Sequence, residues 1–262
     1  MFKSIDQLGR EIDFTNLPKR IISLVPSQTE LLHYLGLENE VVGITKFCIH
    51  PNEWFNNKPR IGGTKNVNIE AIKALNPDLI FANKEENVKE QIEELAKYYP
   101  VWISDVNNFG DALQMILSIG DLVGKVYKAE NLIAQLRAIY TDLLPNHLLQ
   151  STVCYLIWRN PYMTVGGNTY INNMLQYVGV KNVFENTARY PEITMEQIEA
   201  TNCNFVLLSS EPYPFKQVHI DEIKAIMPNT KVLLVDGEMF SWYGSRLKYA
   251  PEYFSRLQEK LK

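Results

Sequence analysis

The sequence predicts an α/β fold of two lobes, each a mainly parallel sheet with flanking helices, joined by one long helix. Short apolar runs alternate with amphipathic stretches, which is typical of βαβ units. The same order of elements occurs twice, and between the two copies lies a long stretch with helical periodicity. We therefore expect an N-terminal lobe over 1–106, a linking helix over 107–147 and a C-terminal lobe over 148–262.

The first lobe opens with an apolar run that ends in a polar turn. Strands are expected at 21–25, 41–45, 79–82 and 100–103, and helices at 28–35, 68–75 and 87–98. The run 79–82 is apolar at every position, which is typical of a parallel strand covered on both faces.

The linking segment has apolar residues at spacings of three and four from Phe109 to Leu143. This pattern predicts one nearly unbroken helix over 109–144. Gly120 and Gly124 are weak points, because a glycine inside a helix costs about 1 kcal/mol relative to alanine. Pro145 is expected to end the helix.

The second lobe repeats the first. Strands are expected at 153–158, 205–209 and 232–235, and helices at 169–178, 194–200, 219–226 and 251–261. The run 21–36, a strand and a helix stopped by glycine, matches 153–179, and 67–82 matches 193–208. Two similar lobes enclose a cleft, and clefts between lobes are where small molecules bind.

Composition excludes several classes of protein. A net charge of −4 and a pI near 5.7 leave no basic stripe, so we expect no nucleic-acid partner. No apolar run approaches the roughly 18 residues that span a bilayer. Cys48, Cys154 and Cys203 are scattered and odd in number, which predicts buried or free thiols.

Catalytic motifs are missing from the sequence. There is no G-x-S-x-G and no phosphate-binding G-x-x-x-x-G-K, and Gly62-Gly63 lacks the dinucleotide-binding spacing. The run Gly166-Gly167-Asn168-Thr169 could form an anion site at a helix start or a tight turn, and we favour the turn. We expect a protein that is not an enzyme.

Several segments together carry a family resemblance. They are 20–27, 29–32, 42–45, 62–65, 68–70, 75–80, 169–171, 179–183 and 240–244. The chain resembles the substrate-binding proteins of ABC importers with a rigid helical backbone (class III periplasmic binding proteins), the group that binds vitamin B12, ferric siderophores and haem. The ending Phe240-Ser241-Trp242-Tyr243-Gly244 is most similar to the B12-binding branch.

The resemblance implies a monomeric substrate-binding protein that holds a corrinoid, such as cobalamin, in the cleft between its lobes and needs no cofactor. Its partners would be the permease dimer of an ABC transporter and its ATPase. Glu70 and Glu196 fall on the positions that dock on arginines of the permease. The alternative is that both are ordinary glutamates in the first turn of a helix, favoured there by the helix dipole.

Candidate ligand-binding residues follow the expected strand ends, where ligands of α/β sheets bind. Aromatic side chains dominate them and suit a broad, flat, partly apolar ligand. The candidates are Phe47, His50, Trp54, Trp158, Tyr162, Glu238, Phe240, Trp242, Tyr243 and Arg246. His50 could also ligate a metal such as the cobalt of a corrinoid, although Cys48 and His50 alone fall short of the about four ligands of a structural zinc site.

Two alternatives remain for function and two for location. A ferric siderophore or haem protein would use convergent cations, for which Lys46, Lys65, Arg159 and Arg246 are placed. The chain could also be a cytosolic corrinoid or metal-cofactor carrier, or an enzyme that reuses the scaffold.

The N-terminus lacks the apolar core of a signal peptide, which predicts the cytoplasm if the sequence is complete as written. If an export segment was removed, we expect the periplasm or cell envelope.

Overall fold

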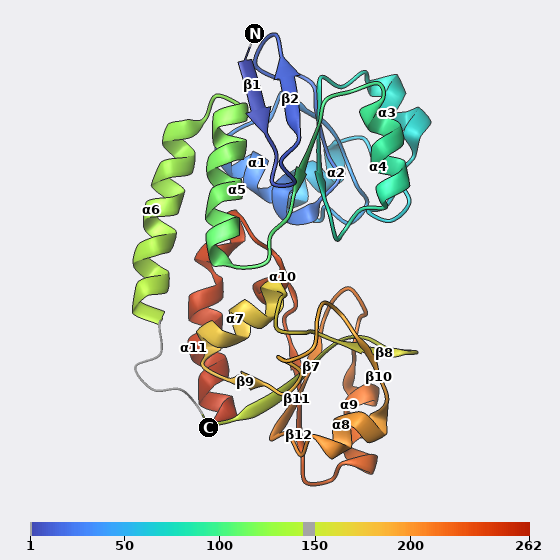
Figure 1. The fold of residues 1–262 in the computed structure, drawn as a ribbon, viewed down its shortest axis with the longest axis vertical. Helices are drawn as coiled ribbons and strands as arrows, with labels where there is room; N and C mark the ends of the chain where they lie inside the picture. The colour runs from blue at the N-terminus through green and yellow to red at the C-terminus, as the bar shows by residue number, and fades with distance from the viewer. Residues whose placement is uncertain (1, 144–149) are drawn as a thin grey trace. The chain divides into compact units, whose positions relative to one another are not determined.

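The computed structural model describes residues 2–143 and 150–262 of the chain (Figure 1). It contains two compact units. Unit 1 comprises Met1–Val106, Gly110–Gln135 and Tyr243–Arg246, and unit 2 comprises Asn107–Phe109, Leu136–Trp242 and Leu247–Lys262. The end of the expected linking helix, with Pro145, lies outside the described residues.

Unit 1 contains the parallel sheet that the sequence predicts. Its strands lie in the order β4-β3-β5-β6, with β3 at Ile21–Ser23, β4 at Val41–Ile44, β5 at Leu79–Asn83 and β6 at Val101–Ser104. All three neighbouring pairs are parallel. The carboxyl ends of the four strands therefore point to one edge of the sheet, which we call the carboxyl edge of unit 1.

Helices cover both faces of this sheet. Helices α3 (Ile69–Leu75) and α4 (Lys89–Ala96) bury Ile72 and Ile92 against one face. On the other face Phe81 and Trp102 pack with ring centroids 6.0 Å apart, and α1 (Pro26–Leu35) brings Gln28 beside Met115 of α5. Helix α2 (Asn52–Asn57) follows β4. Because both faces are covered, β5 is buried along its whole length.

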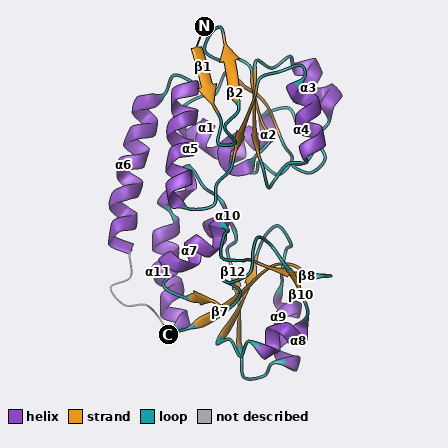
Figure 2. Cartoon of the chain, viewed as in Figure 1, coloured by secondary structure: helices purple, strands orange, loops and turns teal. Residues whose placement is uncertain are grey.

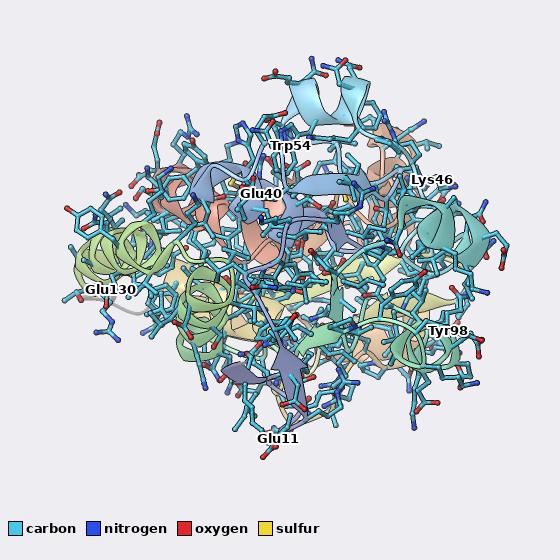
Figure 3. The ribbon with its side chains drawn as sticks, turned by 90° about the horizontal axis from the view of Figure 1, so that it is seen from above. Glu11, Glu40, Lys46, Trp54, Tyr98 and Glu130 are labelled. Atoms are coloured by element: carbon cyan, nitrogen blue, oxygen red, sulfur yellow. The ribbon has the colours of Figure 1, made fainter. Side chains whose placement is uncertain are left out.

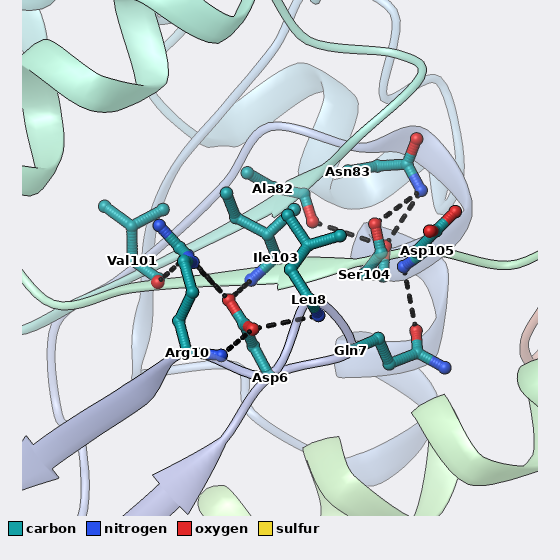
Figure 4. Close-up of polar contacts among 10 residues, drawn as sticks. All are labelled: Asp6, Gln7, Leu8, Arg10, Ala82, Asn83, Val101, Ile103, Ser104 and Asp105. Atoms are coloured by element: carbon teal, nitrogen blue, oxygen red, sulfur yellow. Dashed lines mark hydrogen bonds and ion pairs between the residues drawn. The ribbon is translucent and has the colours of Figure 1, made fainter.

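An N-terminal hairpin, which the sequence analysis did not predict, protects the edge of this sheet (Figure 4). Strands β1 (Phe2–Ile5) and β2 (Glu11–Phe14) pair antiparallel, and the turn between them lies along β6. The main chain of Gln7 donates to Ile103 O at 3.2 Å. The carboxylate of Asp6 accepts the N–H of Ile103 at 3.3 Å and that of Leu8 at 2.9 Å. An edge strand covered in this way cannot pair with another chain.

The predicted continuous helix over 109–144 is wrong. The segment forms two helices, α5 (Phe109–Leu122) and α6 (Val126–Leu143), which run antiparallel (Figures 1 and 2). Gly124 adopts φ +68°, Lys125 N–H donates to Gly120 O, and Gly124 N–H donates to Asp121 O. This is a Schellman cap, which ends α5. The helices approach so closely that a Cβ on Gly120 would lie 2.4 Å from Ala129 Cβ.

The sheet of unit 2 repeats the strand order of unit 1. Strands β7 (Thr152–Trp158), β11 (Phe205–Ser209) and β12 (Lys231–Val235) are parallel, and β9 (Lys181–Asn182) pairs with the start of β7. The order β9-β7-β11-β12 therefore matches β4-β3-β5-β6. Two additional strands, β8 (Tyr162–Thr164) and β10 (Glu192–Ile193), extend the sheet from the end of β7.

The helices of unit 2 also follow the predicted repeat. They are α7 (Tyr170–Val178), α8 (Met195–Ala200), α9 (Gln217–Ile226), α10 (Glu238–Ser241) and α11 (Ala250–Leu261), with a short 3₁₀ turn at Ser245–Lys248. Helix α1 ends at Gly36 (φ 84°) and α7 at Gly179 (φ 81°). Helices α3 and α8 each begin after a capping side chain, Asn68 and Thr194.

In the part of the chain that the structure describes, no helix combines the length and the apolar character needed to cross a membrane. The three cysteines are free and buried, as the sequence predicts.

Candidate functional site

The carboxyl edge of unit 1 presents an exposed aromatic ring. Phe47 lies in the loop after β4 and is 50% exposed, and the Nζ of Lys46 lies 5.1 Å from its ring centroid. The ring packs closely over Gly63, because a Cβ there would lie 3.1 Å from Phe47 Cε2. Figure 3 labels Lys46. Unit 1 thus offers an apolar face with a cation beside it.

Behind this loop, Cys48 is buried and His50 is half-buried. The hydroxyl oxygens of Thr29 and Thr45 lie 3.0 and 3.2 Å from Cys48 Sγ. Burial raises the pKa of the Cys48 thiol, so the neutral form is favoured and Cys48 is a poor metal ligand. Among the described residues, no three His, Cys, Asp or Glu side chains gather in a way that could hold a metal. A metal-binding role for His50 stays a prediction.

Trp54 does not belong to the ligand surface, contrary to the sequence prediction. Its side chain is fully buried, and its indole N–H donates to the carboxylate of Glu38. The ring of His33 packs edge-on at 5.2 Å, and Lys58 Nζ lies 5.1 Å from the indole (Trp54 is labelled in Figure 3). Trp54 is therefore a structural residue that anchors α2.

The corresponding edge of unit 2 carries an aromatic group that we call the Trp158 cluster. Its members are Trp158, Arg159, Tyr162, Tyr213, Phe215 and His219. Trp158 is the last residue of β7 and is 39% exposed. The ring of Tyr213, from the loop after β11, meets it edge-on at 5.7 Å. Unit 2 thus also presents an exposed aromatic face at the carboxyl ends of its parallel strands.

Arg159 and Tyr162 form the polar side of the cluster. Hydrogen bonds with Tyr162 and then Tyr213, together with the charge of Glu222, raise the pKa of Arg159. Arg159 Nη2 lies 2.7 Å from Glu222 Oε2. The charge of Arg159 is therefore balanced inside unit 2 by a carboxylate.

The sequence analysis missed Tyr213, Phe215 and His219. His219 is buried in α9, and its Nε2 lies 3.3 Å from the hydroxyl of Tyr213. The rings of Tyr213 and Phe215 are 4.8 Å apart. The available signal was the run Glu211-Pro212-Tyr213-Pro214-Phe215, which places two aromatic residues directly after a predicted strand.

The C-terminal aromatic run is mostly structural. Phe240 was expected in a ligand-binding loop, but it lies in α10 and is fully buried, 5.1 Å from the rings of Tyr155 and Phe254. The expected loop is wrong, because α10 turns the side chain into the core of unit 2. A ligand contact for Phe240 stays a prediction. Trp242 is 6% exposed, and its indole N–H donates to Glu211 Oε1 at 2.9 Å.

The polar groups near α10 are partly buried. Burial, more than the charge of Glu238, raises the pKa of Glu211, whose carboxylate also accepts the hydroxyl of Ser241. Glu238 opens α10 and is half-buried, and its N–H donates to Asp236 Oδ1 at 3.1 Å. A ligand contact for Glu238 stays a prediction.

Residues 243–246 form a strap that belongs to unit 1. Tyr243 is buried and donates to Glu86 Oε1 at 3.0 Å. Arg246 makes a bidentate pair with Glu30, with Nε–Oε2 at 2.8 Å and Nη2–Oε1 at 2.9 Å. Both side chains of this pair are less than one-fifth exposed. The expected ligand contacts by Tyr243 and Arg246 are thus not supported, because these side chains hold the strap in place.

The two predicted docking glutamates occupy equivalent surface positions. Glu70 lies in the first turn of α3, is 82% exposed and pairs with Lys73 at 3.0 Å. Glu196 lies in the first turn of α8 and is exposed, and a hydrogen bond from Thr194 lowers its pKa. Water and salt screen such exposed contacts, and both carboxylates are accessible to a partner.

Each of the two α/β units thus carries an exposed aromatic side chain, Phe47 or Trp158, at the carboxyl edge of its sheet. The chain belongs to the periplasmic binding protein family, whose model matches residues 21–226. The family resemblance that the sequence carries is confirmed.

Two known proteins are similar in sequence to most of this chain. The chain is similar to the uncharacterized ABC transporter substrate-binding lipoprotein YvrC of Bacillus subtilis (strain 168), with 26% identity over 92% of this chain and 80% of the relative. It is similar to a vitamin B12-binding protein of Vibrio parahaemolyticus, with 26% identity over 69% of this chain and 66% of the relative.

Solved structures confirm the fold class. The periplasmic heme-binding protein RhuT from Roseiflexus sp. RS-1 superimposes with a TM-score of 0.79 at 21% identity, over 93% of this chain and 97% of that protein. At this identity the likeness establishes the two-unit α/β fold with parallel sheets.

Proposed function

We propose that this chain is the substrate-binding protein of an ABC-type importer and that its ligand is a corrinoid of the cobalamin type. The observation that carries the proposal is the pair of exposed aromatic rings, Phe47 and Trp158, at the carboxyl edges of the two parallel sheets. Such rings provide large contact areas for a flat macrocycle at low entropic cost. Family membership and the similarity to a vitamin B12-binding protein support the same ligand class.

Three of the four candidate cations, all except Lys46, favour a corrinoid over an anionic ferric siderophore. Arg159 and Arg246 are each paired with a glutamate. The ammonium group of Lys65 donates to the main chain of Glu85. An anionic chelate would have to compete with these partners, whereas a neutral corrin periphery would not. Haem and ferric siderophores are the alternative ligands.

Titration with cobalamin, cobinamide, haem and a ferric siderophore tests the ligand. At about 100 times its dissociation constant, a bound corrinoid is expected to raise the free energy of unfolding by about 2.7 kcal/mol. Calorimetry and tryptophan fluorescence should report the binding. Phe47→Ala and Trp158→Ala are each expected to weaken binding about tenfold or more, because each removes an aromatic contact.

The control is Tyr98→Ala, because Tyr98 is 57% exposed in unit 1 but follows α4 instead of a strand end. It should bind as the wild type does. Saturating corrinoids that leave fluorescence, heat and melting temperature unchanged would overturn the corrinoid proposal, and binding of haem or siderophore alone would reassign the ligand.

The proposed partner is a permease dimer with its ATPase. Glu70 and Glu196 supply one exposed carboxylate in each unit, at equivalent positions of the repeat. A dimeric permease can present one arginine site to each of them, and arginine–carboxylate pairs are often bidentate.

The double variant Glu70→Ala/Glu196→Ala is expected to keep its stability within about 0.5 kcal/mol and to keep its ligand affinity. Binding to the cognate permease should fall by about 100-fold or more, because each permease arginine would lose its partner. Surface plasmon resonance against the reconstituted transporter measures this.

Glu90→Ala is the matched control, since Glu90 is an exposed glutamate in the first turn of α4. If the double variant binds the permease as well as Glu90→Ala does, the docking role is wrong. A wild-type chain that binds no permease would favour a carrier that works without a transporter.

A further inference from the structure

His219 joins the start of α9 to the Trp158 cluster through its two ring nitrogens. Its Nδ1 accepts the main-chain N–H of Lys216 at 2.8 Å. A main-chain N–H can only donate, so Nδ1 carries no hydrogen in this arrangement and the ring hydrogen is on Nε2. Nε2 lies 3.3 Å from the hydroxyl oxygen of Tyr213, to which it donates. The ring is 7% exposed, so water does not replace these partners readily.

The position of the Tyr213 side chain depends on its contacts with other residues, because Tyr213 lies in the loop between β11 and α9 and not in a strand. Its ring packs against Phe215 at 4.8 Å and against the imidazole at 5.5 Å. The ring centroid of Tyr213 lies 5.7 Å from that of the Trp158 indole, and the two ring planes are 70° apart. The orientation of the exposed Trp158 ring therefore depends on Tyr213, and that of Tyr213 on His219.

We propose that His219 is a positioning residue that holds Tyr213, and through it Trp158, in the orientation that binds the ligand. The inference rests on the proposed function, because it takes Trp158 as part of the ligand surface. The ring of His219 also accepts the N–H of Lys216 at the start of α9, so it is held on the helix side as well as on the side of Tyr213.

The charged and titratable groups around His219 come from three segments. Arg159 follows β7 and contacts Tyr213, which lies after β11. Glu222, from α9, lies 2.7 Å from Arg159, and Lys216 lies at the start of the same helix. Arg159 is thus a second hydrogen-bond partner of Tyr213, so the contribution of His219 has to be separated from that of Arg159.

Two variants separate the two contacts of the ring. His219→Asn places Oδ1 near the position of Nδ1, so it keeps an acceptor for Lys216 N–H but loses the donor to Tyr213. Tyr213→Phe keeps the aromatic ring and removes the hydroxyl that contacts both His219 and Arg159. Each is expected to weaken cyanocobalamin binding about three- to tenfold, and the double variant should be no weaker than Tyr213→Phe alone.

Rescue by a conservative variant distinguishes positioning from a general structural role. His219→Gln places its amide nitrogen near the position of Nε2, so it keeps a donor to Tyr213 but loses the acceptor for Lys216 N–H. It should bind cyanocobalamin within about twofold of the wild type, whereas His219→Asn should bind about three- to tenfold more weakly. Equal affinities of His219→Gln and His219→Asn would overturn the inference.

A ligand-free measurement keeps the test independent of the ligand. Nitrogen-15 spectra should show the Nε2–H tautomer of His219. The indole resonance of Trp158, assigned with Trp158→Phe, should differ between the wild type and His219→Asn at the same pH. An Nδ1–H tautomer, or an indole resonance that His219→Asn leaves unchanged, would overturn the positioning role. If these spectra behave as expected but no corrinoid binds at any pH, the proposed ligand is wrong and the positioning of Trp158 by His219 stands.

Discussion

Replacement of Asp6 by alanine is expected to lower the free energy of unfolding by about 3–5 kcal/mol, because it leaves buried donors without their acceptor. The side chain of Asp6 is completely buried and accepts Arg10 Nε at 2.7 Å and the N–H groups of Leu8 and Arg10 at 2.9 Å. It also accepts the N–H of Ile103 in β6 (Figure 4). One side chain thus holds the N-terminal hairpin to the edge of the sheet. Urea denaturation followed by circular dichroism measures the loss.

Asp13→Ala is the matched control, since Asp13 lies in the same hairpin but its side chain is 65% exposed. Its ion-pair contact with Lys3 is long, at 4.0 Å. Its effect should stay within about 0.5 kcal/mol. Arg10→Ala should cost less than Asp6→Ala, because the carboxylate keeps the N–H donors of Leu8, residue 10 and Ile103. An Asp6→Ala protein as stable as Asp13→Ala would show that the hairpin does not depend on this pair.

The sheets could be predicted because their signals are local. The run 205–208 is apolar throughout and forms most of the buried strand β11, as expected for a strand covered on both faces. The repeat added a second, independent signal, since Gly36 and Gly179 end equivalent helices with positive φ. Each of these features depends on residues close together in the sequence.

The helix break and the hairpin could not be predicted in the same way. The apolar spacing continues through Gly124 because both α5 and α6 bury a face, so periodicity does not reveal the turn between them. Gly124 was visible as a weak point, but only its capping hydrogen bonds show that the chain reverses. The hairpin is held by Asp6 and Ile103, which are 97 positions apart.

The residues of the candidate site also divide into those that the sequence predicts and those that it does not. The sequence marks aromatic residues after strands, and the structure leaves Phe47 and Trp158 exposed while it buries Trp54 and Phe240. Burial of a single aromatic ring depends on which elements pack over it, and this is a tertiary property. His219 was missed for the same reason, because its two partners lie in the loop before α9 and its role appears only from their geometry.

Phe240→Ala is expected to lower the free energy of unfolding by about 3–5 kcal/mol, the usual cost of emptying a core aromatic site. The ring is fully buried between Tyr155 of β7 and Phe254 of α11, and Tyr253 packs at 6.2 Å. Its removal would leave a cavity between the sheet and two helices that cannot easily collapse. Thermal and urea denaturation of the variant measure this cost.

The opposite behaviour is expected of Phe47→Ala, which removes an aromatic ring that is half exposed. That variant should keep its stability within about 0.5 kcal/mol and lose corrinoid affinity, whereas folded Phe240→Ala should bind nearly as well as the wild type. If Phe240→Ala instead melts like the wild type and loses binding, α10 must open to present Phe240 to the ligand. The aromatic ending would then be a contact surface, as the sequence alone predicts, and the packed arrangement with Tyr155 and Phe254 would be a ligand-free state that binding displaces.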